Sequence, residues 1–269
     1  MLSRGRWPIT VALPVLQSHG VTEPGHFRSA NEDCFAFNDD LQLMVVADGM
    51  GGHNAGEIAA RLAVDSIVEF VRDRRAPPLF EELWPFGFNP SLSAAANRIR
   101  TAIHLADQRI LEASMNGHAY AGMGTTVVAA LVGEGRLAVG HVGDSRLYLV
   151  SNSELRPLTR DDAWTASVLA SDPTIDPLVV RHHPMRNALT NVVGTKPGAL
   201  AHVTETMLTT GDVIALVTDG VHGVLDDRWL SRILSGGGDV RAMAEDLVES
   251  AIARGSRDNC TAVVARYLA

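Results

Sequence analysis

The stretch Leu41-Gln42-Leu43-Met44-Val45-Val46-Ala47 runs directly into Asp48-Gly49-Met50-Gly51-Gly52-His53. The first part is rich in residues that favour β-strands, and the second has the glycines of a turn. Together they predict a strand that ends in a carboxylate. The same arrangement recurs at Asp144, which follows the apolar run 137–142, and at Asp219, which follows the run 213–218.

A fourth aspartate, Asp258, lies just before the apolar run 261–265. Carboxylates at strand ends can meet at one edge of a sheet even when they are far apart in the chain. Two carboxylates at about 4 Å repel each other by roughly 4 kcal/mol at an effective dielectric constant of 20. Hard divalent cations remove that penalty and prefer oxygen ligands. The pattern therefore predicts a dinuclear Mg²⁺ or Mn²⁺ site, whereas any single Asp-Gly pair is also an ordinary turn.

An arginine followed by a carboxylate pair, in Arg28-Ser29-Ala30-Asn31-Glu32-Asp33, suits a site that holds both metal-bound water and an anion. With this segment included, the chain resembles the metal-dependent protein phosphatases, the type 2C serine/threonine phosphatases, and among them the stand-alone bacterial enzymes. The resemblance extends from about residue 18 to the end of the chain. Its segments occur in the family's order: 28–33, 48–57, Gly124-Thr125-Thr126, 142–146, 218–221 and 257–261.

The resemblance implies a set of metal ligands. Asp48 bridges two Mn²⁺ or Mg²⁺ ions, and Gly49 supplies its backbone carbonyl to the first ion. Asp219 and Asp258 bind the second ion. A glycine after the bridging aspartate makes sense because the backbone must approach the ion closely. Two metals held in this way activate a water for attack on a phosphate monoester.

The resemblance also implies roles around the metals. Arg28 is the candidate phosphate ligand, because a guanidinium offers a planar fork to phosphate oxygens. Glu32 and Asp33 accept hydrogen bonds from the waters around the metals. Asp144 corresponds to the ligand of a weaker third metal that it shares with Asp219. For Asp144, a structural role in a tight hairpin turn is the alternative.

The chain departs from the family pattern at two places. Many eukaryotic members have a histidine, the proposed general acid, where this chain has Met50. His53 follows three residues later and either forms hydrogen bonds near the site or is structural, so the general acid stays open, with metal-bound water as one candidate. Asp161-Asp162-Ala163 stands where the family more often has Asp-His-Ser. This second departure affects the geometry expected beside the active site.

The remaining sequence predicts helices and hairpins. Helical periodicity follows Gly56 as far as Arg72, begins again at Asn89-Pro90 and runs through Ile110, and returns from 239 to 252. Turn residues at 133–135 and 151–154 indicate two hairpins. This mixture favours an α+β fold with antiparallel sheets covered by helices. The resemblance sharpens it to a four-layer αββα sandwich, with two central, mostly antiparallel sheets and a helix pair on each outer side.

No Gly/Ser-rich or charged linker divides the 269 residues. We expect residues 1–17 to form an N-terminal tail and the start of the first strand, and residues 18–269 to form a single catalytic domain. Signals for regular structure weaken at about 161–186. The resemblance implies a mobile flap beside the active site there, and a solvated connection is the alternative.

Composition limits the partners. A net charge of −8 without a basic cluster argues against nucleic-acid binding. Cys34 and Cys260 have neither a metal-binding nor a redox spacing, which favours a reduced cytosolic protein. No apolar run approaches the roughly 20 residues that cross a bilayer. With the resemblance, we expect a monomeric cytoplasmic enzyme that acts on phosphoserine and phosphothreonine proteins, including a eukaryotic-like serine/threonine kinase.

Two other functions remain as alternatives. A catalytically silent, phosphatase-like module would act by binding or regulation, but such modules usually lose metal aspartates, and Asp48, Asp219 and Asp258 are present. A two-metal phosphodiesterase or nuclease would fit the carboxylates. It would not fit the ordered segments or the absence of a basic groove.

Overall fold

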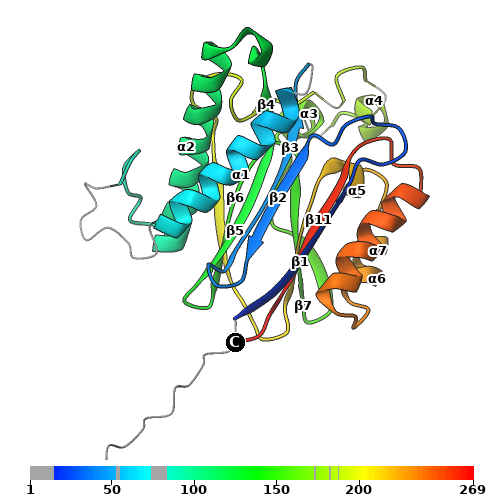
Figure 1. Cartoon of the computed structure of the whole chain (residues 1–269). Coiled ribbons are helices and arrows are strands. Elements are labelled where there is room, and N and C mark those ends of the chain that lie inside the picture. Colours follow the sequence, from blue (N-terminus) through cyan, green and yellow to red (C-terminus); the bar gives the residue numbers. More distant parts are fainter. Residues whose placement is uncertain (1–14, 53–54, 74–83, 173, 182, 187) are drawn as a thin grey trace, which may run out of the picture.

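Two antiparallel sheets lie face to face between two groups of helices (Figure 1). The computed structural model describes residues 15–52, 55–73, 84–172, 174–181, 183–186 and 188–269, so most of the predicted tail lies outside the described residues. The first sheet has the order β2-β3-β5-β6-β9 with β4 paired to β3, and the second has the order β1-β11-β10-β7-β8. The first sheet contains β2 (Asp33–Asn38), β3 (Leu43–Met50), β4 (Gly124–Thr125), β5 (Val127–Gly133), β6 (Arg136–Val142) and β9 (His202–Met207). The second contains β1 (Leu16–Glu23), β7 (Arg146–Ser151), β8 (Glu154–Pro157), β10 (Val213–Val217) and β11 (Cys260–Tyr267).

Helices cover the outer face of each sheet, which confirms the predicted αββα sandwich. The first sheet is covered by α1 (Ala55–Asp73) and α2 (Ala94–Asn116), and a short 3₁₀ turn, η2 (His118–Tyr120), follows α2. The second sheet is covered by α5 (Asp219–His222), α6 (Asp227–Leu234) and α7 (Val240–Ala253). None of the described helices is both long enough and apolar enough to cross a membrane.

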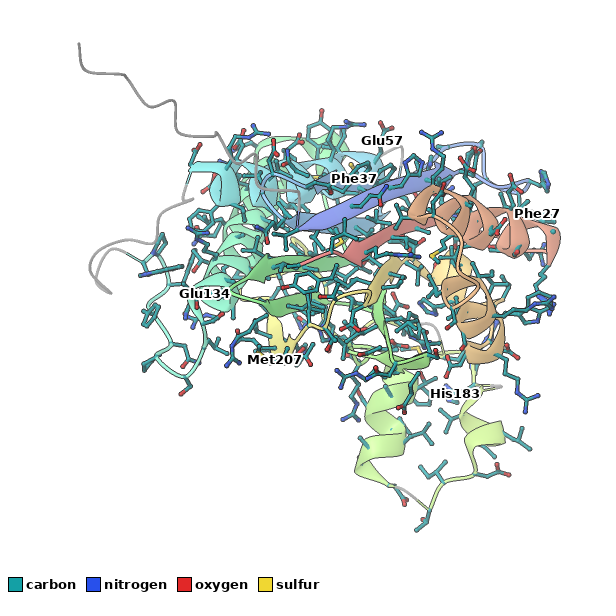
Figure 2. The ribbon with its side chains drawn as sticks, turned by 90° about the horizontal axis from the view of Figure 1, so that it is seen from below. Phe27, Phe37, Glu57, Glu134, His183 and Met207 are labelled. Atoms are coloured by element: carbon teal, nitrogen blue, oxygen red, sulfur yellow. The ribbon has the colours of Figure 1, made fainter. Side chains whose placement is uncertain are left out.

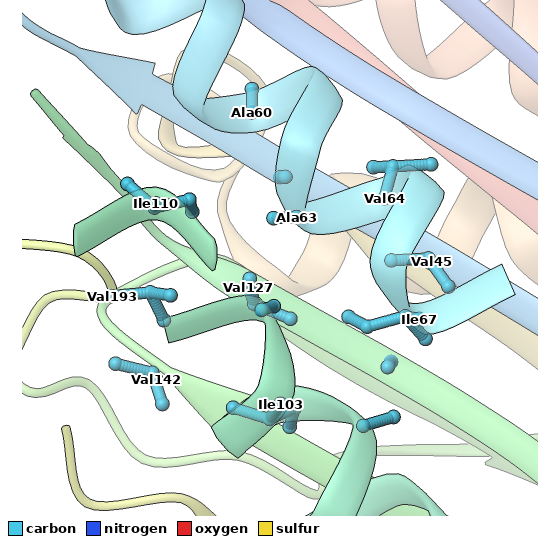
Figure 3. Packing of buried hydrophobic residues seen from close by; sticks show 14 of the residues in the cluster. Val45, Ala60, Ala63, Val64, Ile67, Ile103, Ile110, Val127, Val142 and Val193 are labelled. Atoms are coloured by element: carbon cyan, nitrogen blue, oxygen red, sulfur yellow. The ribbon is translucent and has the colours of Figure 1, made fainter. Parts of the chain in front are cut away.

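The uninterrupted apolar run of β3 reflects burial on both of its faces. Leu43, Val45 and Ala47 pack beneath α1 and α2, in the cluster shown in Figure 3. Met44 and Val46 point the other way, into the layer between the two sheets. Successive side chains of a strand alternate between its faces. Asp48 therefore continues the set that faces the second sheet.

The second sheet is built in the same way. Val213, Ala215 and Val217 of β10 pack against the helices, and Ile214 and Leu216 pack between the sheets. Both central strands are thus fixed by contacts on two faces. A one-residue slip would exchange those faces, so the burial also fixes the strand register.

Two details differ from the sequence-based prediction. The second helix begins at Ala94, with Ser93 as its N-cap, and not near Asn89. The Ser93 hydroxyl accepts from the Ala96 amide at 3.1 Å. The Asn89 carbonyl and side chain instead accept from two nearby amides and close a separate turn. The second difference is β9, a strand for which the sequence analysis predicted nothing.

The segment 161–186, the predicted flap, contains two short helices between β8 and β9. They are α3 (Trp164–Ser171) and α4 (Pro177–Arg181). Figure 2 shows them projecting from the body of the molecule, with His183 beside α3. The Trp164 and His183 rings stack with centroids 4.2 Å apart. No α3 residue is buried, so α3 adds little to the core, whereas Val180 of α4 is buried.

Replacement of Gly140 should reveal how closely α2 packs on β6. A Cβ at Gly140 would lie 2.3 Å from Ile99 Cγ2 and 2.8 Å from Ile103 Cδ1. We expect Gly140→Ala to destabilise the protein by about 1–3 kcal/mol, because extra volume in a packed core forces neighbours to move. Urea unfolding measures the loss. Gly238→Ala is the matched control, since a Cβ there would meet only Ala242 Cβ, at 3.8 Å. Equal urea midpoints for the two variants would contradict close packing of α2 on β6 at Gly140.

Candidate active site

Five carboxylates and one arginine line a single cavity of ≈ 440 Å³ at one end of the two sheets. They come from loops and strand ends that are far apart in the sequence: Arg28, Glu32, Asp48, Asp144, Asp219 and Asp258. A cavity of the same volume lies behind the flap, lined in part by His141 and His202. The charged lining, and not the volume, therefore distinguishes the candidate site. Of the predicted site residues, Gly49 also lines it, and Asp33 does not.

Asp48 is held at the end of β3 by two threonines of the Gly-Thr-Thr segment. Its amide donates to Thr126 Oγ1 at 3.1 Å, and its carbonyl accepts from the Thr126 amide at 2.8 Å and from Thr125 Oγ1 at 2.9 Å. Gly49 follows where the chain meets the start of α1. A Cβ at Gly49 would lie only 2.1 Å from the Gly56 carbonyl oxygen. Only glycine fits at position 49, because the backbone there passes directly against the backbone of Gly56.

Asp33 lies beside Asp48, because the two residues are Cα partners in the β2–β3 pairing. Its carboxylate is buried and accepts from Thr218 Oγ1 at 3.0 Å and from Thr261 Oγ1 at 2.6 Å. Burial raises the pKa of Asp33 to about 7, and the two threonine hydrogen bonds oppose that rise. Its Oδ1 is buried without a hydrogen-bond partner among the described residues. Asp33 thus links the ends of β10 and β11 to β2.

Asp144 lies in the tight turn between β6 and β7. Gly143 before it has φ +98, and a Cβ there would meet Thr126 Cγ2 at 2.7 Å. On the other side, His222 Nε2 lies 3.0 Å from the Asp144 carbonyl. The Asp144 carboxyl nevertheless reaches the cavity. Asp144 therefore belongs to a tight turn and also lines the cavity.

Arg28 and Asp258 form an ion pair across the mouth of the cavity, with Nη2 and Oδ2 2.6 Å apart. Asn259, which is buried, holds the loop that carries Arg28. Its Oδ1 accepts from the Glu32 amide at 2.8 Å, and its Nδ2 donates to the carbonyls of Pro24 at 3.1 Å and Ala30 at 2.9 Å. One side chain thus fixes the loop 24–32 against the start of β11.

Three cavity aspartates have a raised pKa. The pKa of Asp48 is raised well above its ordinary value, first by burial and then by the charges of Asp33 and Asp219. Burial raises the pKa of Asp144 to about 7, with a further contribution from Asp219. Burial and then Asp258 raise the pKa of Asp219. Crowded carboxylates of this kind favour binding of positive charge.

The donor set fits hard divalent cations. All the candidate side-chain donors are oxygens, and Asp219 Oδ1 is buried with no hydrogen-bond partner in the described part of the chain. Within the described ranges, no three acidic, histidine or cysteine side chains are close enough to enclose one ion. Asp258 is instead paired with Arg28. Ions in such sites also take backbone carbonyls and waters as ligands, so fewer carboxylates per ion suffice.

Sequence reasoning placed the cavity carboxylates and Arg28 but missed their supports. Asn259 and Thr261 stand in the quoted segment 257–261, and Thr126 stands in Gly-Thr-Thr, so each had a signal that was given no role. Leu189 and Val192, which also line the cavity, had none. Met50 lines the cavity as a neutral side chain. His53 lies outside the described residues.

Asn259→Ala should show how much the hydrogen bonds of Asn259 contribute to stability. It removes the partners of the Glu32 amide and of two loop carbonyls, and a buried polar group without a partner costs about 1–3 kcal/mol. We expect a loss of that size in urea unfolding. The exposed Asn116, at the end of α2, provides the matched control Asn116→Ala. If Asn259→Ala were as stable as the control, Asn259 would not be fixing the loop 24–32.

Comparisons with known proteins agree with this geometry. The family model described as Protein phosphatase 2C matches residues 26–250. The chain is 28% identical over 246 residues to the serine/threonine phosphatase stp of Listeria monocytogenes, covering 90% of this chain and 92% of that protein. It is 31% identical over 256 residues to the serine/threonine protein phosphatase PstP of Mycobacterium tuberculosis, covering 93% of this chain and 45% of that protein.

The fold has the same relatives. A solved structure of the catalytic domain of PstP in complex with 2 manganese ions matches with a TM-score of 0.79 and 27% identity, covering 95% of this chain and 99% of that one. The family model spans most of the chain. On these grounds, the chain belongs to the protein phosphatase 2C family.

Proposed function

We propose that this protein hydrolyses phosphoserine and phosphothreonine in proteins, using a site for two Mn²⁺ or Mg²⁺ ions. One observation supports this above all: Arg28 and the carboxylates of Asp48, Asp219 and Asp258 line one cavity. A phosphate-binding arginine and a set of metal-binding carboxylates are therefore close enough to contact the same phosphate group of a substrate. The family supplies the reaction class, and the cavity supplies residues suited to it.

The proposed metal ligands come from four separate segments of the chain. Asp48 would bind both ions, the Gly49 carbonyl would be a further ligand of the first, and Asp219 and Asp258 would hold the second. Asp144 is the proposed ligand of a third, weaker ion shared with Asp219. When bound, the ions neutralise the phosphate and activate the attacking water. The threonine hydrogen bonds to Asp48 hold its backbone in place without engaging its carboxylate.

Arg28 binds and orients the phosphate. Its ion pair with Asp258 uses Nη2, and a guanidinium has five N–H donors in a fixed fork. The remaining donors can bind phosphate oxygens while Asp258 holds the plane of the fork. Glu32, on the same loop, lines the cavity and accepts hydrogen bonds from waters within the site. Asp33, beside Asp48, does not line the cavity, and within the residues described only its buried Oδ1 remains free to accept from a water, because Oδ2 is bonded to Thr218 and Thr261.

The cellular setting completes the proposal. A phosphatase of this kind would oppose a eukaryotic-like serine/threonine kinase, and that kinase would itself be a substrate. We propose that the enzyme acts in the cytoplasm as a monomer. A size-exclusion profile at the monomer mass and dephosphorylation of a phosphorylated kinase domain would support this assignment.

Removal of metal should abolish turnover. We expect EDTA-treated protein to release no phosphate from a phosphothreonine peptide, and added Mn²⁺ or Mg²⁺ to restore release, because the proposed ligands are oxygens that these ions prefer. Added Mn²⁺ should also raise the melting temperature, since it binds only the folded site. Asp48→Asn should lower the rate by more than the ~10- to 100-fold that loss of a group supporting a metal ligand costs.

Asp176→Asn, at an exposed turn of the flap, is the control for loss of one carboxylate charge. Full activity in metal-free protein would eliminate the mechanism. A folded, metal-loaded protein without turnover on phosphopeptides would favour the silent, regulatory module.

Replacement of Arg28 should act mainly on substrate binding. We expect Arg28→Ala to raise KM for phosphopeptides, with a smaller effect on kcat, because the fork binds phosphate in both the ground state and the transition state. Arg28→Lys should recover only part of the loss, since an ammonium keeps the charge without the fork. Arg257→Ala removes a nearby charge that does not line the cavity and serves as the control. An unchanged KM would return Arg28 to a structural role.

A further inference from the structure

The flap is attached to the body through a short paired base, residues 161–164 and 188–191. Ala163 and Leu189 form a β-bridge. The Trp164 amide donates to the Ala188 carbonyl at 2.8 Å, and the Thr190 amide donates to the Asp162 carbonyl at 2.7 Å. Leu189, in this base, lines the active-site cavity. The position of the base therefore sets one wall of the site.

Asp162 is the residue on which the base converges. Its Oδ2 accepts from the Gly143 amide at 3.0 Å and from Asn191 Nδ2 at 2.7 Å, and its Oδ1 lies 2.9 Å from His202 Nε2. Its own amide donates to the Gly143 carbonyl at 2.9 Å. One carboxylate thus binds the outgoing flap strand to the returning strand, to β9 and to the turn that carries Asp144.

The support behind Asp162 is partly buried, because His202 is 38% exposed and the His141 ring behind it is buried. The His202 ring stacks on the His141 ring, with centroids 5.0 Å apart. His141 is only 4% exposed, and its Nε2 lies 2.9 Å from the Arg160 carbonyl. His202 therefore cannot move away from Asp162 without disturbing a packed histidine pair and the chain just before the flap. This gives the Asp162 carboxylate a fixed position.

The bonds to Gly143 place Asp162 next to the catalytic cavity. Gly143 and Asp144 are consecutive, and the Asp144 carbonyl is held from the opposite side by His222. Two reciprocal bonds with Asp162 fix the Gly143 peptide groups, so the direction of the Asp144 carboxyl depends on them. A carboxylate can accept from three donors at once, which a histidine or serine side chain cannot do.

We propose that Asp162 is a positioning residue that sets the flap base and the Asp144 carboxyl as one unit. The inference rests on the proposed phosphatase function for its kinetic consequences. Movement of the flap base would shift Leu189 and the Asp144 turn together. Misplacement of a catalytic group by about 1 Å costs on the order of 100-fold in rate, so even partial loosening is measurable.

Three variants test the proposal. Asp162→Ala removes the three side-chain bonds. Asp162→Asn retains the bonds to Gly143 and Asn191, because its carbonyl oxygen can accept from both, and its amide can donate to His202 Nε2 when the ring adopts the tautomer with the proton on Nδ1. Asp172→Ala, within the flap but away from its base, removes an exposed carboxylate that bonds only to Thr174 in the described structure. Each is compared on a phosphothreonine peptide and on p-nitrophenyl phosphate over a range of Mn²⁺ concentrations.

For Asp162→Ala we expect kcat/KM on the peptide to fall by about tenfold or more, with a smaller loss on p-nitrophenyl phosphate. The Mn²⁺ concentration for half-maximal peptide turnover should rise. Thermolysin should cleave the flap faster at its exposed Leu178 and Val179. Asp162→Asn and Asp172→Ala should stay within about threefold of the wild type in every measurement.

Wild-type peptide kinetics and flap cleavage in Asp162→Ala would overturn the proposal. Losses that are equal on both substrates and follow the melting temperature would also overturn it, since they indicate general destabilisation. If Asp162→Ala does not fold, Asn191→Ala removes a single arm and should show the same changes at smaller size. If the wild type hydrolyses neither substrate, the phosphatase proposal fails, and flap cleavage still tests the positioning role.

Discussion

Repulsion among the carboxylates of the cavity is the constraint on which this structure depends. Two ionised carboxylates at about 4 Å would repel each other by roughly 4 kcal/mol at an effective dielectric constant of 20. Burial makes the ionised forms still less favourable, as the raised pKa values of Asp48 and Asp219 show. A cluster with that cost persists only if the surrounding framework holds the backbone and if positive charge is available. Arg28 supplies one such charge at Asp258.

The framework meets this requirement by burying both faces of its central strands. A one-residue shift of β3 or β10 would exchange the side chains on their two faces and disturb close packing in two layers of the core. Threonines then complete the strand ends: Thr126 binds the Asp48 backbone, and Thr218 and Thr261 bind the Asp33 carboxylate. These short hydroxyl side chains join the two sheets at the site without adding charge. The stable core and the unfavourable cluster are therefore parts of one arrangement.

The sequence predicted what depends on local pattern. The apolar run 43–47 identified β3, and turn residues at 133–135 and 151–154 identified two hairpins. Predictions failed where the structure of a segment depends on residues far away in the sequence. β9 has the polar sequence His202-Val203-Thr204-Glu205-Thr206-Met207 and forms a strand because β6 offers it an edge. Ser93 begins α2 in place of Asn89 because the Asn89 side chain is committed to a local turn. Asn259 fixes a loop more than 200 residues away in sequence, which no local pattern indicates.

The flap shows why its segment gave such weak signals. The N-cap position of α3 is Ala163, which has no capping side chain, and α4 has only 5 residues. Helices that short are marginal unless tertiary contacts stabilise them, and Leu178, Val179 and Met185 remain exposed. The contacts that locate the flap lie instead at its base, where Asp162 binds β9 and the Asp144 turn. A flap of low intrinsic stability on a firmly bonded base can change its outer surface without changing the cavity wall. The exposed outer part of the segment and the base that lines the cavity are thus held by different contacts.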